Sequence, residues 1–168
     1  MSSLPQGIHS ATCIGVIDIG TQKSMYNFSK KVVLLWEVYV NNKVKIFSRE
    51  YIWSYHEKST LRLHLESWRG GSFTKNELSN FELCNVLGIP CKLEIRKNNK
   101  GLKCVTNIYR FPKNEDVPIL KSKLILFDLN NDKTYASLDY VPTYIIEKVK
   151  QSPEYTKFIS GRQTGVVK

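Results

Sequence analysis

The stretch KKVVLLWEVYVNNKVKIFSREYIW, residues 30–53, contains two strand-like segments separated by Asn41-Asn42. Residues 30–40 are rich in β-branched and aromatic side chains, and residues 43–53 alternate polar with apolar ones. Two asparagines between such segments are typical of a tight turn. The stretch therefore predicts a β-hairpin.

A further strand is predicted before this hairpin. Residues 11–19, ATCIGVIDI, are apolar and β-branched, whereas residues 20–31, GTQKSMYNFSKK, are mostly polar. We expect the strand to end at Asp18–Ile19 and Gly20 to open a loop over residues 20–31.

The end of this strand also resembles a nucleotide-binding loop. GVIDIGTQKS, residues 15–24, looks like the phosphate-gripping loop of the actin and hexokinase type of ATPase. That fold needs two large lobes, about twice this chain, because ordinary domains contain roughly 100 to 200 residues. No second phosphate motif follows, so we expect Asp18 to accept hydrogen bonds from loop amides rather than to bind a metal.

Residues 57–88 predict a helical insertion. Within residues 58–68 three apolar side chains recur at positions i, i+4 and i+7, which is the spacing of a helix face. Thr74 and Glu77 form the pattern of a capping box, which predicts the start of a second short helix.

A second hairpin follows the insertion. Residues 91–97 alternate apolar with charged side chains, NNKG at 98–101 predicts a turn, and residues 102–111 complete the pair. In the remaining chain, residues 124–129 predict a strand and the segment after Pro142 predicts a short helix.

This order of elements predicts a mainly β fold, the five-stranded Greek-key barrel called the OB-fold, with its helical insertion between strands three and four. Such barrels bind oligonucleotides across strands two and three, between the first loop and the loop of the last hairpin. We expect the barrel to span residues 1–111 and residues 112–168 to be an extension packed on it. Other small barrels and split-sheet α+β domains also fit the pattern.

Composition narrows the class of protein. The chain has 168 residues, which suits one domain, and a formal net charge of +10. This charge indicates either an anionic partner or an ordinary solvated basic face. The cysteines lack zinc-ligand spacing, so we expect reduced thiols, no metal and no cofactor. No apolar run is long enough to span a membrane, and we expect a cytoplasmic protein.

Basic and aromatic side chains are interleaved in three segments that the proposed barrel would bring together. Single-strand binders need this mixture, since cations contact phosphates and rings stack on bases. The candidates in the first loop and in the third strand are Lys23, Tyr26, Phe28, Lys30, Lys31, Lys43, Lys45, Phe47, Arg49, Tyr51 and Trp53. Those around the last hairpin turn are Arg96, Lys97, Lys100 and Lys103.

The aromatic rings of the third strand could be part of the hydrophobic core instead of binding bases. Aromatic residues are strong strand formers, so Phe47 and Tyr51 could fill the barrel interior instead of stacking on bases. Trp53 could cover the helix. The sequence leaves these alternatives open.

Residues 48–91, from SREYIW to LGIPC, resemble a family of bacteriophage-encoded OB-fold single-stranded-DNA-binding proteins from replication modules. VIDIGTQ (16–22) and SPEYTKF (152–158) support the resemblance. It implies single-strand binding without strong sequence preference and without catalysis. Bacterial housekeeping single-strand binders recruit partners through an acidic tail, whereas this chain ends in GRQTGVVK, so we expect recruitment through another surface such as residues 128–147.

The sequence thus predicts a non-enzymatic single-stranded-DNA-binding protein of phage replication or recombination. Besides DNA, the expected partners are phage or host replication proteins and a second copy of the chain. An RNA-binding barrel and a protein-interaction module are the alternatives, because a stacking surface serves either. An enzyme is less consistent with the chain, since His56, Glu57 and Ser59 lack any accompanying catalytic motif.

Overall fold

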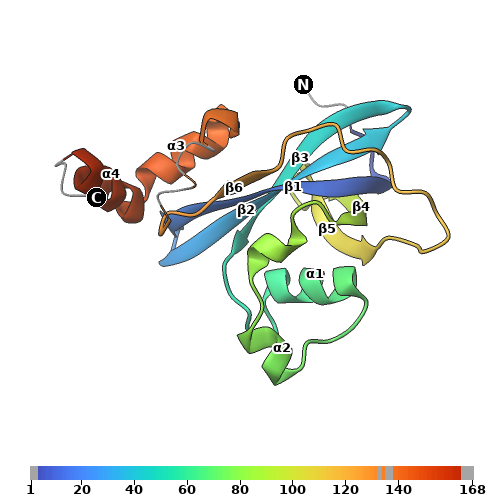
Figure 1. The fold of residues 1–168 in the computed structure, drawn as a ribbon, viewed down its shortest axis with the longest axis horizontal. Coiled ribbons are helices and arrows are strands. Elements are labelled where there is room, and N and C mark those ends of the chain that lie inside the picture. Colours follow the sequence, from blue (N-terminus) through green and yellow to red (C-terminus); the bar gives the residue numbers. More distant parts are fainter. Residues whose placement is uncertain (1–3, 132–133, 135–137, 164–168) are drawn as a thin grey trace.

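The computed structural model describes residues 4–131, 134 and 138–163, so parts of the segment 128–147 and the end of the chain lie outside this description. Figure 1 shows a curved sheet with helices at two places on it. The elements are β1 (Gly7–Lys23), β2 (Phe28–Val40), β3 (Lys43–Ile52), α1 (Thr60–Arg69), α2 (Lys75–Ser79), η1 (Leu83–Val86), β4 (Pro90–Lys97), β5 (Lys103–Arg110), β6 (Ile125–Phe127), α3 (Thr143–Gln151) and α4 (Pro153–Gln163). The predicted order of strands, helical insertion and strands is confirmed; α4 was not predicted.

The six strands form one mainly antiparallel sheet. Their order is β3-β2-β1-β4-β5, and β6 adds to β1 in parallel. The two edge strands, β3 and β5, approach each other, since Nη1 of Arg49 donates a hydrogen bond to the carbonyl of Val105 at 2.7 Å. The chain is therefore mainly β and barrel-like, as predicted at this coarser level.

The hairpin of β2 and β3 forms as the sequence predicts. Val40 pairs with Lys43, and both turn residues adopt left-handed backbone conformations, with φ of 51° at Asn41 and 64° at Asn42. Asparagine is one of the few residues that tolerate this conformation, which two-residue hairpin turns require. The Asn-Asn pair thus fixes the register of the two strands.

The first loop is much shorter than predicted. β1 continues to Lys23 and β2 begins at Phe28, so residues 24–27 alone connect them. Gly20, with φ of 71°, lies at a shift in the register between β1 and β2, which lets the ladder continue. The polar side chain of Gln22 donates to the carbonyls of Ile19 and Lys148. The expectation that Asp18–Ile19 ends the strand is therefore wrong.

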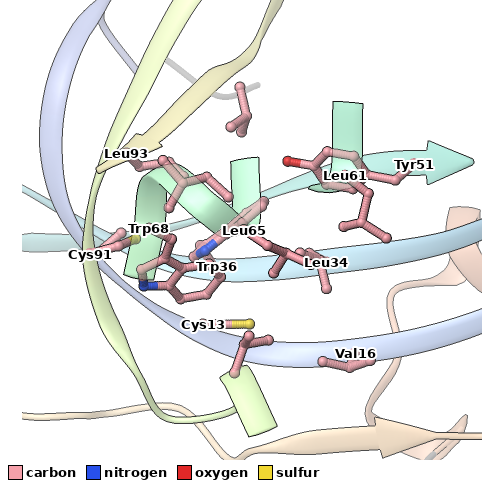
Figure 2. Close-up of a cluster of buried hydrophobic side chains, with 14 of the residues drawn as sticks. Cys13, Val16, Leu34, Trp36, Tyr51, Leu61, Leu65, Trp68, Cys91 and Leu93 are labelled. Carbon is pink, nitrogen blue, oxygen red and sulfur yellow. The ribbon is translucent and has the colours of Figure 1, made fainter. Parts of the chain in front are cut away.

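β1 and β2 are buried on both faces. On one face Trp36, Leu34 and Cys13 pack with α1, which contributes Leu65 and Trp68 (Figure 2). On the other face lies a second cluster, made by alternate residues of β1 and β2 with β6 and α3: Ile14, Ile17, Ile19, Val33, Leu35, Phe127, Ile145 and Val149. Burial on both faces explains why these strands read as continuous apolar runs.

The helical insertion has the caps that its sequence predicts. The side chain of Ser59 accepts a hydrogen bond from the backbone of Arg62 at the start of α1, and Gly70, with φ of 82°, ends that helix. Thr74 and Glu77 form the predicted capping box of α2. The insertion thereby turns the apolar face of α1 toward the sheet.

A buried carboxylate attaches the connection between β5 and β6 to the sheet. Glu37 accepts hydrogen bonds from the backbone amides of Lys121, at 3.0 Å, and Ser122, at 2.8 Å, and from the hydroxyl of Tyr39. Burial raises the pKa of Glu37, but the hydrogen bonds from Ser122, Tyr39 and Lys121 together lower it by more. The pKa of Glu37 therefore lies below its ordinary value of 4.5.

Replacing Glu37 with glutamine is expected to reduce the free energy of unfolding at pH 7 by about 1 to 3 kcal/mol, because an amide donor then faces other donors. Since folding lowers the pKa of Glu37, its contribution is present above pH 4.5 and is lost as the pH falls through the folded pKa. Urea unfolding at pH 7 and pH 3 should therefore show a smaller difference for Glu37→Gln than for the wild type. The exposed Glu57→Gln is the control, and a pH dependence equal to that of the wild type would contradict this role.

Candidate nucleic-acid interface

The loop between β1 and β2 presents aromatic rings to solvent. Tyr26 is 91% exposed and Phe28 is 68% exposed. The hydroxyl of Ser24 bonds to the backbone and side chain of Asn27, which closes the turn beneath the rings. Lys23 and Lys30 are also exposed. We refer to residues 23–30 as the aromatic end; it offers rings for stacking beside cations for phosphates.

Lysines gather at the opposite end of the sheet, around residues 4–7. The ammonium of Lys103 donates to the carbonyl of Leu4 at 2.6 Å, and the amide of Lys97 donates to the side chain of Gln6 at 3.0 Å. Lys43 and Lys45 line the same small hollow as Leu4. Lys100 is exposed in the adjoining turn. We refer to Lys43, Lys45, Lys97, Lys100 and Lys103 as the basic end.

The two loops with candidate binding residues lie near opposite ends of β1. The start of β1 pairs with the end of β4, with Gly7 opposite Ile95, so the 98–101 turn lies beyond that start. The aromatic end follows the other end of β1, whose 17 residues would span about 55 Å if straight. The register of β1 with β4 sets this separation, and β3 runs between the two ends.

The predicted stacking face of β3 points mainly into the protein. Tyr51 is only 2% exposed, and its hydroxyl lies 2.7 Å from Nδ1 of His64. Phe47 and Trp53 are half-buried against the same core cluster. On the opposite face Ile46 is 44% exposed and Ile52 57%. Tyr51 thus belongs to the core, one of the two alternatives that the sequence left open, whereas Phe47 and Trp53 are only partly buried.

Several of the predicted cations have partners within the protein. The guanidinium of Arg49 lies 5.0 Å from the ring centre of Tyr51, and the ammonium of Lys30 lies 5.0 Å from that of Trp53. Lys31 forms an ion pair with Glu50 at 3.1 Å. Near the last turn, Arg96 lies 3.5 Å from Glu94. These contacts restrict the positions of the cationic groups. The side chain of Lys30 is nevertheless exposed to solvent.

Two exposed tyrosines at the start of α3 and just before it, Tyr144 and Tyr140, were not among the predicted site residues. The hydroxyl of Tyr144 lies 2.6 Å from that of Ser48, and Lys148 pairs with Glu50, so α3 packs beside the outer face of β3. Tyr144 is 56% exposed. Nearby in the chain, Lys123 lies 4.1 Å from the ring centre of exposed Tyr140. Tyr140 precedes α3, and Tyr144 lies in its first turn.

Two buried titratable groups are structural. Asp18 accepts hydrogen bonds from the amides of Gly20, at 2.9 Å, and Leu129, at 3.3 Å, which confirms that it binds amides. Burial raises the pKa of Asp18. Burial, followed by the positive charge of Arg49, lowers the pKa of His64 to about 4, so His64 is neutral at pH 7.

The described residues contain no cluster of three His, Cys, Asp or Glu side chains suited to a metal ion. The four cysteines are free; Cys13 and Cys91 are buried, and Cys84 and Cys104 are half-buried. In the same part of the chain, no helix is long and apolar enough to cross a membrane.

Comparisons of this chain with models of protein families, with curated proteins and with solved structures find no match in any of the three. The interface therefore has to be interpreted from its own residues.

Proposed function

We propose that this protein binds single-stranded DNA without strong sequence preference and without catalysis. The observation that carries the proposal is the aromatic end, where Tyr26 and Phe28 are exposed among lysines on a chain of net charge +10. Clustered exposed apolar side chains, here Met25, Tyr26 and Phe28, mark interaction sites, and the bases of a single strand are suitable partners for the rings.

The fold supports this proposal. We assign it to the OB class, in which a helix connects the third and fourth of five barrel strands. The order β3-β2-β1-β4-β5, the antiparallel pair of β1 and β4, and the position of α1 agree with this assignment. The hydrogen bond from Arg49 in β3 to the carbonyl of Val105 in β5 links the two edge strands, which lie side by side in a closed barrel.

The proposed path of the strand runs along β3, from the basic end to the aromatic end. β3 has ten residues, which span about 33 Å. Lysines at one end would contact phosphates, and rings at the other would stack on bases. The proposed role in phage replication or recombination rests on the family resemblance of the sequence, which residues 48–91 carry in the main.

The exposed lysines of the 98–101 turn provide a direct test. Replacing Lys97 and Lys100 together with alanine is expected to reduce the slope of log affinity against log salt by about 1.4 for a labelled oligo-dT, because each phosphate contact on a single strand contributes about 0.7. Fluorescence anisotropy between 50 and 300 mM salt measures this slope. The control is Lys75→Ala, which removes an exposed lysine of α2; equal slopes for the double variant and the wild type would place the strand elsewhere.

A further inference from the structure

A pocket of about 490 Å³, lined by charged and hydroxyl side chains beside apolar ones, lies where β3 leads into α1. Three cations line it, Lys31, Arg49 and Lys58, against one carboxylate, Glu50. Glu50 is already paired with Lys31, at 3.1 Å, and with Lys148. Its charge is therefore balanced from within the protein, and the pocket keeps an excess of positive charge.

Arg49 is a cation of this pocket that has no carboxylate partner among the described residues. Within the described residues it forms no ion pair, and its Nη1 donates to the neutral carbonyl of Val105. Its Nε is buried and has no acceptor there. A partly buried cation without a counter-ion is unfavourable, so an anion entering the pocket would be stabilised by Arg49.

The rest of the lining adds polar groups. The hydroxyls of Ser54 and Thr60 belong to it, whereas the hydroxyl of Ser59 already donates to the carbonyl of Ser54 at 2.7 Å. Lys58 is exposed and has no ion pair in the described chain. The first turn of α1 carries no acidic side chain, so nothing local balances the partial positive charge at this helix end.

We propose that this pocket binds a phosphate group. Phosphate matches the lining because its charge suits Arg49 and Lys58, and its oxygens accept hydrogen bonds from hydroxyls and guanidinium groups. The volume lies within the usual range of small-ligand pockets. Resting on the function proposed above, the position along β3 indicates a phosphodiester of the bound strand as the source, since the pocket lies between the aromatic and basic ends.

The first arm of the test needs no DNA. Sodium phosphate is added to ¹⁵N-labelled protein at constant ionic strength, with chloride as the reference, and amide chemical shifts are recorded. We expect saturable shifts at Ser54, Lys58 and Ser59. Lys58→Glu should weaken phosphate binding about tenfold or more, because a hydrogen bond to a charged group is worth at least that much. Lys75→Glu, on α2, should leave it unchanged. Shifts spread over the surface, or equal binding by Lys58→Glu, would overturn the proposal.

The second arm identifies the source of the phosphate and separates this proposal from the function. Oligo-dT binding that falls about tenfold in Lys58→Glu and is unchanged in Lys75→Glu supports a strand phosphodiester. Oligo-dT binding that is equal in both variants, with the phosphate response intact, assigns the pocket to a free phosphate compound and overturns the strand as source. Phosphate binding by a protein that binds no oligo-dT would overturn the proposed function and leave the pocket standing.

Discussion

The double substitution of Tyr26 and Phe28 with alanine is expected to weaken oligo-dT binding by about 2 to 6 kcal/mol, at least 30-fold in Kd. Each base stacked on an aromatic ring contributes about 1 to 3 kcal/mol, and both rings are exposed beside cations. The salt slope should stay the same, because no phosphate contact is removed. Anisotropy titrations of the variant and the wild type at several salt concentrations measure both quantities.

Two controls sharpen this prediction. Tyr109→Ala removes an exposed ring of β5 away from the aromatic end and should bind as the wild type does. Urea unfolding of the double variant should give a free energy within about 0.5 kcal/mol of the wild type, because exposed side chains contribute little to stability. A variant that keeps its affinity, or that loses stability and affinity together, would contradict the stacking role of these rings.

Replacing Trp36 with alanine is expected to reduce the free energy of unfolding by about 3 to 5 kcal/mol. Trp36 is fully buried at the centre of the first core cluster, and its ring centre lies 6.4 Å from that of Trp68 (Figure 2). The substitution leaves a cavity between β2 and α1. Urea denaturation followed by circular dichroism measures the loss, which is a large share of a typical domain's 5 to 15 kcal/mol.

The matched variant Trp36→Phe should cost about 1 kcal/mol or less. Within the described residues the indole N–H of Trp36 is buried without an acceptor, whereas that of Trp68 donates to the carbonyl of Pro90 at 3.0 Å. Phenylalanine removes this unsatisfied donor, which offsets part of the lost packing. A loss as large as that of Trp36→Ala would show that indole size, and not the unpaired donor, decides the energy at this position.

Local patterns were enough to predict much of the fold. The hairpin over residues 30–53 was predictable because Asn41-Asn42 suits a turn with left-handed backbone. The insertion was predictable because the helical spacing and the Thr74–Glu77 capping box each involve residues that are close in sequence. These patterns depend on residues close in sequence, so they can be recognised without knowledge of the tertiary structure.

The misses depend on contacts between distant segments. β1 extends past Gly20 because Gln22 and Thr21 find partners in Lys148 and Glu154, more than a hundred residues later. The face of β3 that points inward could not be read from alternation, since both faces of this strand mix apolar with polar residues. For the site, the aromatic end was predicted by its residues, whereas Tyr144 entered only through the packing of α3 beside β3.

Fluorescence anisotropy of a labelled oligo-dT, with unlabelled duplex DNA and matching RNA as competitors at two salt concentrations, tests the central claim most directly. The proposed function predicts tight binding that weakens with salt and that duplex DNA does not displace. Displacement by RNA as effective as by single-stranded DNA would assign the site to single strands of either kind. Absence of oligo-dT binding at the lower salt concentration would contradict the proposal and would make the exposed rings of Tyr26 and Phe28 the contact for a protein partner.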